Sequence, residues 1–193
     1  GPGKANTSSV ALYAGRGANV RVRECTLKGC YRGLYLFGNL ISSYDNLVIH
    51  QNFYGIDIEP DAIEFNPNDI HFTNCQVFDN DRCVRATTFP NGAISFIGCE
   101  LEGNNLLGNT TDTVKVVEFS NAGKVTLIGC HMEENPGQYN LYYAGANANC
   151  QLTLIGSDMI PGDSCGTVLY VASGSVSING TRVTNNFGSS QVT

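Results

Sequence analysis

The sequence predicts an all-β protein in which about seven short repeats stack into a solenoid, and three observations support this fold class. The 193 residues include 22 glycines and no tryptophan, only 15% are charged, and β-branched and aromatic residues recur in short runs that favour strands. An eight-residue pattern recurs along the chain, and a second strand with alternating apolar residues follows most of its copies. A chain of this length supports one sizeable core, so we expect a single domain.

The recurring pattern has apolar residues at its first, third and eighth positions, a small or short polar residue at the sixth, and Gly or Asn at the fifth except for Glu24 and Gln51. Its copies are VRVRECTL from Val20, LVIHQNFY from Leu47, IHFTNCQV from Ile70, ISFIGCEL from Ile94, VTLIGCHM from Val125, LTLIGSDM from Leu152 and VSINGTRV from Val176. Each copy can bury its apolar side chains only against neighbouring copies, which is typical of stacked repeats.

The second strands are GLYLF at 33–37, GIDIE at 55–59, CVRAT at 83–87, VVEFS at 116–120, NLYYA at 140–144 and VLYVA at 168–172. Their period-2 alternation predicts strands with one buried face. The rival fold, a β-sandwich, gives no reason for similar residues at matched positions.

These repeats resemble those of right-handed, single-stranded parallel β-helices over roughly residues 19–187. This is the pectate-lyase-like fold of polysaccharide enzymes and of many phage tailspikes. The resemblance implies an architecture of about seven coils but no particular reaction, because the fold hosts lyases, hydrolases, epimerases and receptor binders. The paired aspartates of polygalacturonase-like relatives are missing, and NTTDT at 109–113 matches only part of one of their motifs.

The amino-acid composition restricts the classes of binding partner that we expect. The net charge is −6 and the 11 Lys and Arg residues are scattered, so we expect no nucleic-acid partner. No apolar run approaches the length of a membrane span, and we expect no membrane partner and no cofactor. Gly1 and Pro2 are interpreted as the remnant of a cleaved tag, and residues 3–193 as one β-helix domain from a longer protein.

Four cysteines share the sixth position of the pattern, where Asn52, Ser157 and Thr181 also occur: Cys25, Cys75, Cys99 and Cys130. We expect them to stack as free, buried thiols, because eight cysteines in 193 residues are too few for a disulfide scaffold. The chain has no CxxC pair, so no thiolate metal site is expected. A thiol-rich core suits folding in a reducing bacterial cytosol.

Stacking turns the outward residues of the second strands into columns. One predicted column contains Tyr35, Asp57, Arg85, Glu118, Tyr142 and Tyr170, and its neighbour contains Phe37, Glu59, Thr87 and Ser120. The resemblance implies that the tyrosines and Arg85 bind sugars. Asp57, Glu59 and Glu118 are the candidate catalytic acids, since strand geometry gives them separations that suit inverting glycoside hydrolysis. The alternative is that these acids only solvate the surface and that Arg85 forms an ordinary ion pair between coils.

A second group of acids follows the sixth position of the pattern. Glu100, His131, Asp158 and Arg182 are predicted to form one column, with Glu102 and Glu133 in the next. His131 could act as a general base, or the group could be a ladder of surface ion pairs. His50 and His71 are predicted to lie in adjacent outward columns, and two histidines without a third ligand predict no metal site.

The fourth position of the pattern exposes an isoleucine on three consecutive coils: Ile97, Ile128 and Ile155. Ser and Thr residues flank this column, and contiguous exposed apolar residues favour an interface. Because the tailspikes that the chain resembles are parallel trimers, we predict a homotrimer through this face. Corner loops that cover the isoleucines are the alternative.

The functional prediction is a phage tailspike-type domain that recognises, and could hydrolyse, bacterial surface polysaccharide. Such a depolymerase would act from the virion tail after folding in the bacterial cytosol. The alternatives are a free-standing polysaccharide hydrolase or lyase, and a structural shaft or adhesin without enzymatic activity.

Overall fold

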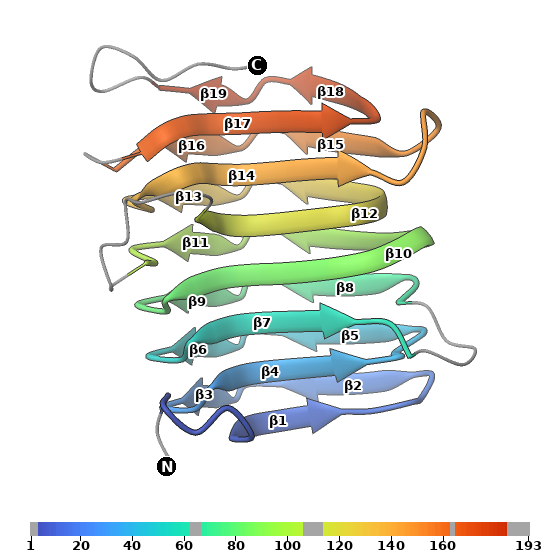
Figure 1. Ribbon diagram of the computed structural model, residues 1–193, viewed down its shortest axis with the longest axis vertical. Coiled ribbons are helices and arrows are strands. Elements are labelled where there is room, and N and C mark those ends of the chain that lie inside the picture. The colour runs from blue at the N-terminus through green and yellow to red at the C-terminus, as the bar shows by residue number, and fades with distance from the viewer. Residues whose placement is uncertain (1–3, 62–66, 106–113, 163–164, 185–193) are drawn as a thin grey trace.

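The computed structural model describes residues 4–61, 67–105, 114–162 and 165–184. It confirms an all-β parallel solenoid of about seven turns, and the described residues contain no helix. In Figure 1 the near strands run left to right, the far strands run right to left, and the chain climbs from bottom to top. The coil is therefore right-handed, as predicted.

The front sheet carries the second strands of the sequence prediction. Its strands pair in parallel in the order β1, β4, β7, β10, β12, β14 and β17 (Figure 1). Their bounds are β1 Val10–Ala14, β4 Arg32–Phe37, β7 Tyr54–Glu59, β10 Arg82–Ile97, β12 Lys115–Ile128, β14 Gly137–Gly145 and β17 Cys165–Ser173.

The back sheet carries the recurring pattern. β10 and β12 turn a corner and supply its middle strands, so that front and back form one continuous sheet. The other back strands are β2 Val20–Arg23, β5 Ser42–Asp45, β8 Ile70–Thr73, β15 Gln151–Ile155 and β18 Ser175–Asn179.

A third sheet of short strands, the side sheet, closes each coil. Its seven strands stack in chain order. They are β3 Thr26–Lys28, β6 Val48–His50, β9 Gln76–Phe78, β11 Glu100–Glu102, β13 His131–Glu133, β16 Asp158–Ile160 and β19 Arg182–Val183.

The core lies inside the coil and is built from the apolar positions of the pattern. In the copy from Ile94, for example, Ile94, Phe96 and Leu101 are all buried. Core rings stack from coil to coil, with centroids 5.2 Å apart for Tyr44 and Phe72 and 4.6 Å for Phe72 and Phe96. Apolar burial is thus shared between neighbouring coils, as the repeat predicted.

The corner between the back and side sheets explains the fifth and sixth positions. The fifth residue has a left-handed backbone, for example Asn74 at φ 52° and Gly98 at φ 61°, which Gly and Asn adopt at least cost. The sixth side chain points inward, and the Cys99 thiol donates to the carbonyl oxygens of Phe72 and Ile97, both at 3.6 Å. All eight cysteines are free, as predicted, although Cys25 is exposed at the first coil.

The predicted register of the second copy is wrong. β5 pairs with both β2 and β8, so the second copy begins at Ser42 and not at Leu47. Leu47 takes the sixth position, and Asn46 the left-handed fifth position. His50 lies on the side sheet between Lys28 and Phe78, away from the back-sheet column of His71.

The error has a physical origin, because the coil has two similar corners. The corner between the side and front sheets also has a left-handed residue followed by an inward polar side chain, as in Gln51 and Asn52. LVIHQNFY therefore matches the pattern at the wrong corner. Asn52 does not join the thiol column.

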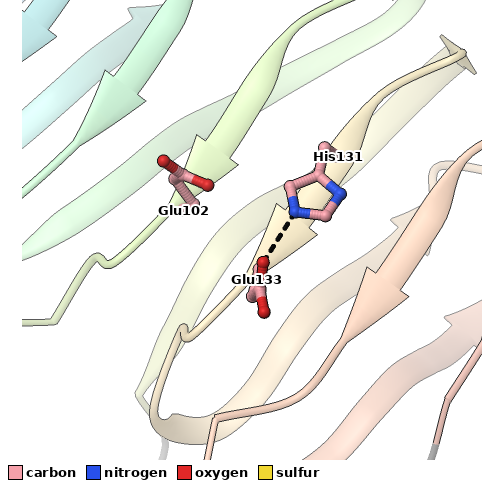
Figure 2. A group of neighbouring side chains, drawn as sticks. All are labelled: Glu102, His131 and Glu133. Carbon is pink, nitrogen blue, oxygen red and sulfur yellow. Dashed lines mark hydrogen bonds and ion pairs between the residues drawn. The ribbon is translucent and has the colours of Figure 1, made fainter.

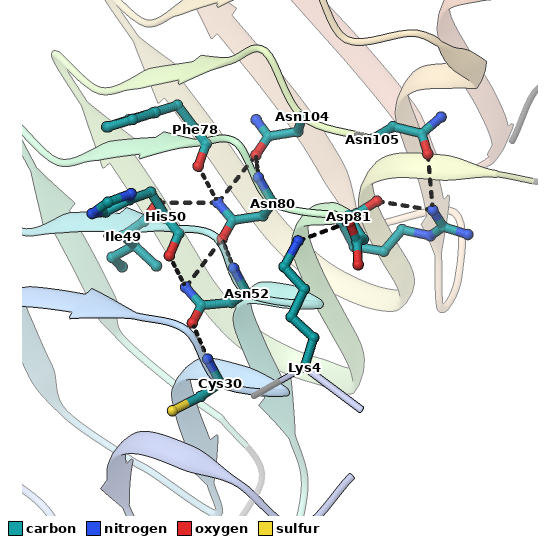
Figure 3. A network of polar contacts seen from close by, with 11 residues as sticks. Lys4, Cys30, Ile49, His50, Asn52, Phe78, Asn80, Asp81, Asn104 and Asn105 are labelled. Carbon is teal, nitrogen blue, oxygen red and sulfur yellow. Dashed lines mark hydrogen bonds and ion pairs between the residues drawn. The ribbon is translucent and has the colours of Figure 1, made fainter. Parts of the chain in front are cut away.

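Asn52 belongs instead to a buried asparagine ladder formed by Asn52, Asn80, Asn104 and Asn135. Figure 3 shows Asn52, Asn80 and Asn104 of this ladder. The Oδ1 of Asn80 accepts from the backbone N–H and the side-chain amide of Asn52, at 3.0 and 3.1 Å. Its Nδ2 donates to the carbonyl oxygens of Ile49 and Phe78 and to Oδ1 of Asn104. One amide per coil thus satisfies the backbone at a buried corner.

Candidate functional site

The predicted front-sheet column is confirmed in register. Tyr35 pairs with Asp57, Asp57 with Arg85, Arg85 with Glu118, Glu118 with Tyr142, and Tyr142 with Tyr170. The column also includes Tyr13, which pairs with Tyr35 and was not predicted. We call these seven residues the stripe.

Three residues earlier on each strand runs a flanking column that the sequence analysis missed. It contains Arg32, Tyr54 and Arg82 in the lower coils, and Lys115 and Tyr139 above them. Strict period-2 alternation would turn these positions inward. Two consecutive buried residues on the strand, such as Gly33 and Leu34 in β4, return them to the outer face, and alternation alone does not predict that shift. Together the columns hold the cations and rings that surround the stripe acids.

Asp57 is fully buried beneath the surface that it was predicted to line. Its Oδ1 accepts from Nε of Arg85 at 2.8 Å, and its Oδ2 accepts from Nη2 of Arg85 at 2.9 Å and from Nε of Arg32 at 2.5 Å. One carboxylate therefore orients two guanidinium groups from the coils on either side. Such charge-assisted pairs are strong and directional.

Glu59 joins the same network. Its carboxylate forms an ion pair with Nη2 of Arg85 and accepts from the hydroxyl of Tyr35 at 2.7 Å. Burial and this hydrogen bond raise the pKa of Tyr35, so the phenol stays protonated as a donor. Burial acts to lower the pKa of Arg85, but its hydrogen bonds and charge interaction with Asp57 outweigh that effect and raise the pKa.

Each of the two guanidinium groups lies over an aromatic ring. Arg32 lies 4.4 Å from the ring centroid of Tyr35, and Arg85 lies 4.4 Å from that of Tyr54. Both distances are within the range of cation–π attraction. The lower half of the stripe is thus a rigid array of alternating rings and cations over buried Asp57.

The upper half holds Glu118 and three tyrosines. Glu118 accepts from Nζ of Lys115 at 2.8 Å and from the hydroxyl of Ser120, and Lys115 lies 3.7 Å from the ring centroid of Tyr142. The rings of Tyr142 and Tyr170 stack with centroids 5.6 Å apart, and Tyr139 lies 4.8 Å from Tyr170. This group, the tyrosine cluster of Tyr139, Tyr142 and Tyr170, is half-buried and presents two phenols on β14 and one on β17 of the next coil.

The structure therefore brings every predicted stripe residue onto one face of the front sheet. Glu59 and Glu118 keep part of their carboxylates exposed, whereas Asp57 does not. The assignment of these acids to catalysis stays a prediction, as does sugar binding by Tyr35, Arg85, Tyr142 and Tyr170. The NTTDT segment at 109–113, which matches part of a polygalacturonase-like motif, lies outside the described residues.

The acids of the side sheet also stack as predicted. Glu100 pairs with His131, His131 with Asp158, and Asp158 with Arg182. An ion pair joins Arg182 to Asp158 at 2.9 Å, and a hydrogen bond of 2.8 Å joins Nε2 of His131 to Oε2 of Glu133. This surface is at least in part a ladder of ion pairs.

The isoleucine column on the back sheet is in register, since Ile97 pairs with Ile128 and Ile128 with Ile155. Ile97 and Ile155 each keep 38% of their surface exposed. Corner loops do not cover them fully, and assembly through this face stays a prediction.

Fold and site together define a parallel β-solenoid with an aromatic and charged stripe along its axis. Comparison with protein-family models, with curated proteins and with solved structures gave no match. The described residues contain no helix long and apolar enough to cross a membrane.

Proposed function

We propose that the stripe binds bacterial surface polysaccharide, and that the chain is a tailspike-type receptor-binding domain of a phage virion. The observation that carries this proposal is the tyrosine cluster beside Lys115 and Glu118. Half-buried rings offer apolar faces to the C–H face of a sugar, and the neighbouring phenols, amine and carboxylate offer hydrogen bonds to its hydroxyl groups.

The repeat of the fold suits a polymeric ligand. Adjacent coils lie about 4.8 Å apart, so the stripe presents similar groups at short, regular intervals along the solenoid axis. A polysaccharide lying along this axis gains several weak contacts at once, and their sum compensates for the low affinity of each one.

Hydrolysis is the second part of the proposal. Glu118 in the stripe and Glu59, two residues after Asp57, have partly exposed side chains, and they are our candidates for general acid and base. In this proposal Asp57 is a positioning residue, because both of its oxygens are occupied by Arg32 and Arg85.

Binding is tested on a panel of purified bacterial capsules and O-antigens. We expect Tyr142→Ala and Tyr170→Ala to weaken binding of the recognised polymer by about 5- to 30-fold each, since a stacking ring contributes on the order of 1–2 kcal/mol. His50→Ala is a matched control, because its ring stacks on Phe78 at 5.1 Å on the side sheet, away from the stripe. Equal affinity in all three variants would remove the stripe as the binding site and favour the structural shaft.

Cleavage is followed by release of reducing sugar from the polymer that binds. We expect Glu59→Gln and Glu118→Gln to lose cleavage while they retain binding, as catalytic groups should. Binding without reducing-sugar release by the parent protein would reject hydrolysis and leave a receptor-binding domain. Ultraviolet absorbance from an unsaturated product would instead identify a lyase.

A further inference from the structure

We propose that Glu102, His131 and Glu133 form a binding site for a divalent first-row metal ion, and we use Zn²⁺ as the ion of this class in the argument and the test below. The three side chains lie on the side sheet, with Glu102 on β11 and the other two on β13 of the next coil (Figure 2). Their ligand atoms all lie within 4.8 Å of one another. The site is separate from the stripe.

Strand geometry explains why these side chains converge. His131 and Glu133 are two positions apart on one strand, so both point outward on the same face. The backbone N–H of Gly103, next to Glu102, donates to the carbonyl oxygen of Glu133 at 2.9 Å, which holds Glu102 beside that pair. Two coils therefore contribute to one group of donors.

The spacing suits a metal ion. Nε2 of His131 lies 2.8 Å from Oε2 of Glu133. Two ligands about 2.1 Å from a common ion are about 3.0 Å apart in octahedral geometry and about 3.4 Å apart in tetrahedral geometry. A small movement of either side chain would bring the two atoms to this separation, so that an ion could bind between them in place of the proton of their hydrogen bond. Glu102 would supply the third ligand.

Charge around the site favours a cation. The carboxylates of Glu133 and Glu134 line the same cavity as Glu102. Among the residues that the structure describes, no Lys or Arg forms a salt bridge with Glu102, Glu133 or Glu134. A cation would relieve this mutual repulsion of the carboxylates.

A neighbouring cavity leaves room for further ligands. It has a volume of about 210 Å³ and is lined by Phe78, Asp79, Glu102, Gly103, Glu133 and Glu134. Water molecules in this cavity could complete the coordination sphere of an ion held by three protein ligands, as in open zinc sites.

The donor set selects the class of ion. Imidazole nitrogen together with carboxylate oxygen suits Zn²⁺ and its first-row neighbours, whereas Ca²⁺ prefers six to eight oxygen ligands. We therefore expect Zn²⁺ to bind and Ca²⁺ at the same concentration to bind far more weakly. Because the ligands come from two coils, bound Zn²⁺ should also stabilise the fold.

The test is calorimetric titration of the metal-free 193-residue chain with Zn²⁺, together with thermal unfolding. We expect one Zn²⁺ per chain, a higher Tm with Zn²⁺, and at least about 10-fold weaker binding in His131→Ala and in Glu102→Gln. Glu133→Gln, a smaller change at a half-buried side chain, should weaken binding in the same way. Circular dichroism of each variant without metal checks that it folds.

Two control variants separate this site from other donors. His71→Ala removes a histidine that pairs with Asp69 at 3.1 Å but belongs to no three-ligand group found among the described residues. Cys25→Ser removes the exposed thiol. Both should bind Zn²⁺ like the parent. The proposal is overturned if the parent binds no Zn²⁺, or if His131→Ala binds as tightly as His71→Ala.

Discussion

Replacement of Asn80 by leucine should destabilise the solenoid strongly, because Asn80 is the central rung of the asparagine ladder. Its side chain is fully buried and makes five hydrogen bonds to Ile49, Asn52, Phe78 and Asn104. Leucine is of similar size, so the substitution removes the polar contacts without leaving a large cavity. The backbone N–H of Asn52 then loses its acceptor inside the protein.

The magnitude follows from these contacts. An orphaned buried donor costs about 1–3 kcal/mol. Each of the four further hydrogen bonds contributes about 0.5 kcal/mol net, the lower end of the usual range, because Nδ2 shares two hydrogens among three acceptors. We therefore expect the free energy of unfolding to fall by about 3–5 kcal/mol. At a slope near 2 kcal/mol per molar urea, the unfolding midpoint should fall by about 2 M. Urea titration followed by circular dichroism measures this change.

The control is Asn179→Leu, which alters an exposed asparagine on β18 near the C-terminal end of the solenoid. We expect a change within about 0.5 kcal/mol for this surface substitution. If Asn80→Leu were no more destabilising than the control, the ladder would contribute nothing to stability, and our account of this corner would be wrong.

Four further predictions concern other parts of the molecule. Asp57→Ala leaves Arg32 and Arg85 without their shared carboxylate. Urea titration should show that the free energy of unfolding falls by about 3 kcal/mol, the lower end of the range for broken buried pairs. The lower end applies because the two arginine side chains are 20% and 25% exposed. Ile128→Lys should dissociate the predicted homotrimer, as measured by sedimentation, because it places a charge in the isoleucine column. Ile41→Lys changes an exposed isoleucine outside this column and should leave the oligomer intact. An unchanged oligomer in Ile128→Lys would refute the interface. The hydrogen bond to Cys130 raises the pKa of Cys99 to about 12. At pH 8 a thiol-specific reagent should therefore label exposed Cys25 fast and Cys99 only after unfolding. Fast labelling of Cys99 in the folded protein would contradict its burial. The pKa of Glu102 is raised in the folded state, so its ionised form destabilises the fold. Without metal, Glu102→Gln should therefore have a higher Tm than the parent at pH 7, where Glu102 is ionised, but not at pH 3. A lower Tm of the variant at pH 7 would show that ionised Glu102 stabilises the fold.

The stripe could be predicted because two periodicities combine. Alternation along a strand assigns Ile56 and Ile58 to the core and turns Asp57 outward, and stacking then places Asp57 beside Tyr35 and Arg85. Neither step needs knowledge of the loops. The column therefore survives the error in the second copy, which affected only the back and side sheets.

Burial of Asp57 could not be predicted from the same alternation. An outward position on a sheet is exposed only if neighbouring side chains are short or point away. Here Arg32 and Arg85, on the strands either side, both fold over the carboxylate. Long side chains from the two adjacent coils decided the exposure of this acid, and their rotamers depend on contacts between coils.

The two corners show a second limit of sequence reasoning. Each has a left-handed residue followed by an inward polar or thiol group, so a local pattern cannot distinguish them. Pairing distinguishes them, because Cys75 and Cys99 stack at one corner while Asn80 and Asn104 stack at the other. A thiol donates one weak hydrogen bond, whereas an amide both donates and accepts and can link successive coils.

This difference bears on where function can reside. The asparagine ladder joins the side sheet to the front sheet, directly before the strands that carry the stripe, and it fixes the start of β7 and β10 from coil to coil. The buried Asp57 network holds the same strands together at their outer surface. A polymer bound along the stripe would therefore meet rings and cations whose spacing is set before binding, so little conformational entropy is lost on association. Loosening the ladder at Asn80 should weaken binding even though Asn80 is buried away from the stripe, and this effect would separate a preorganised surface from a flexible one.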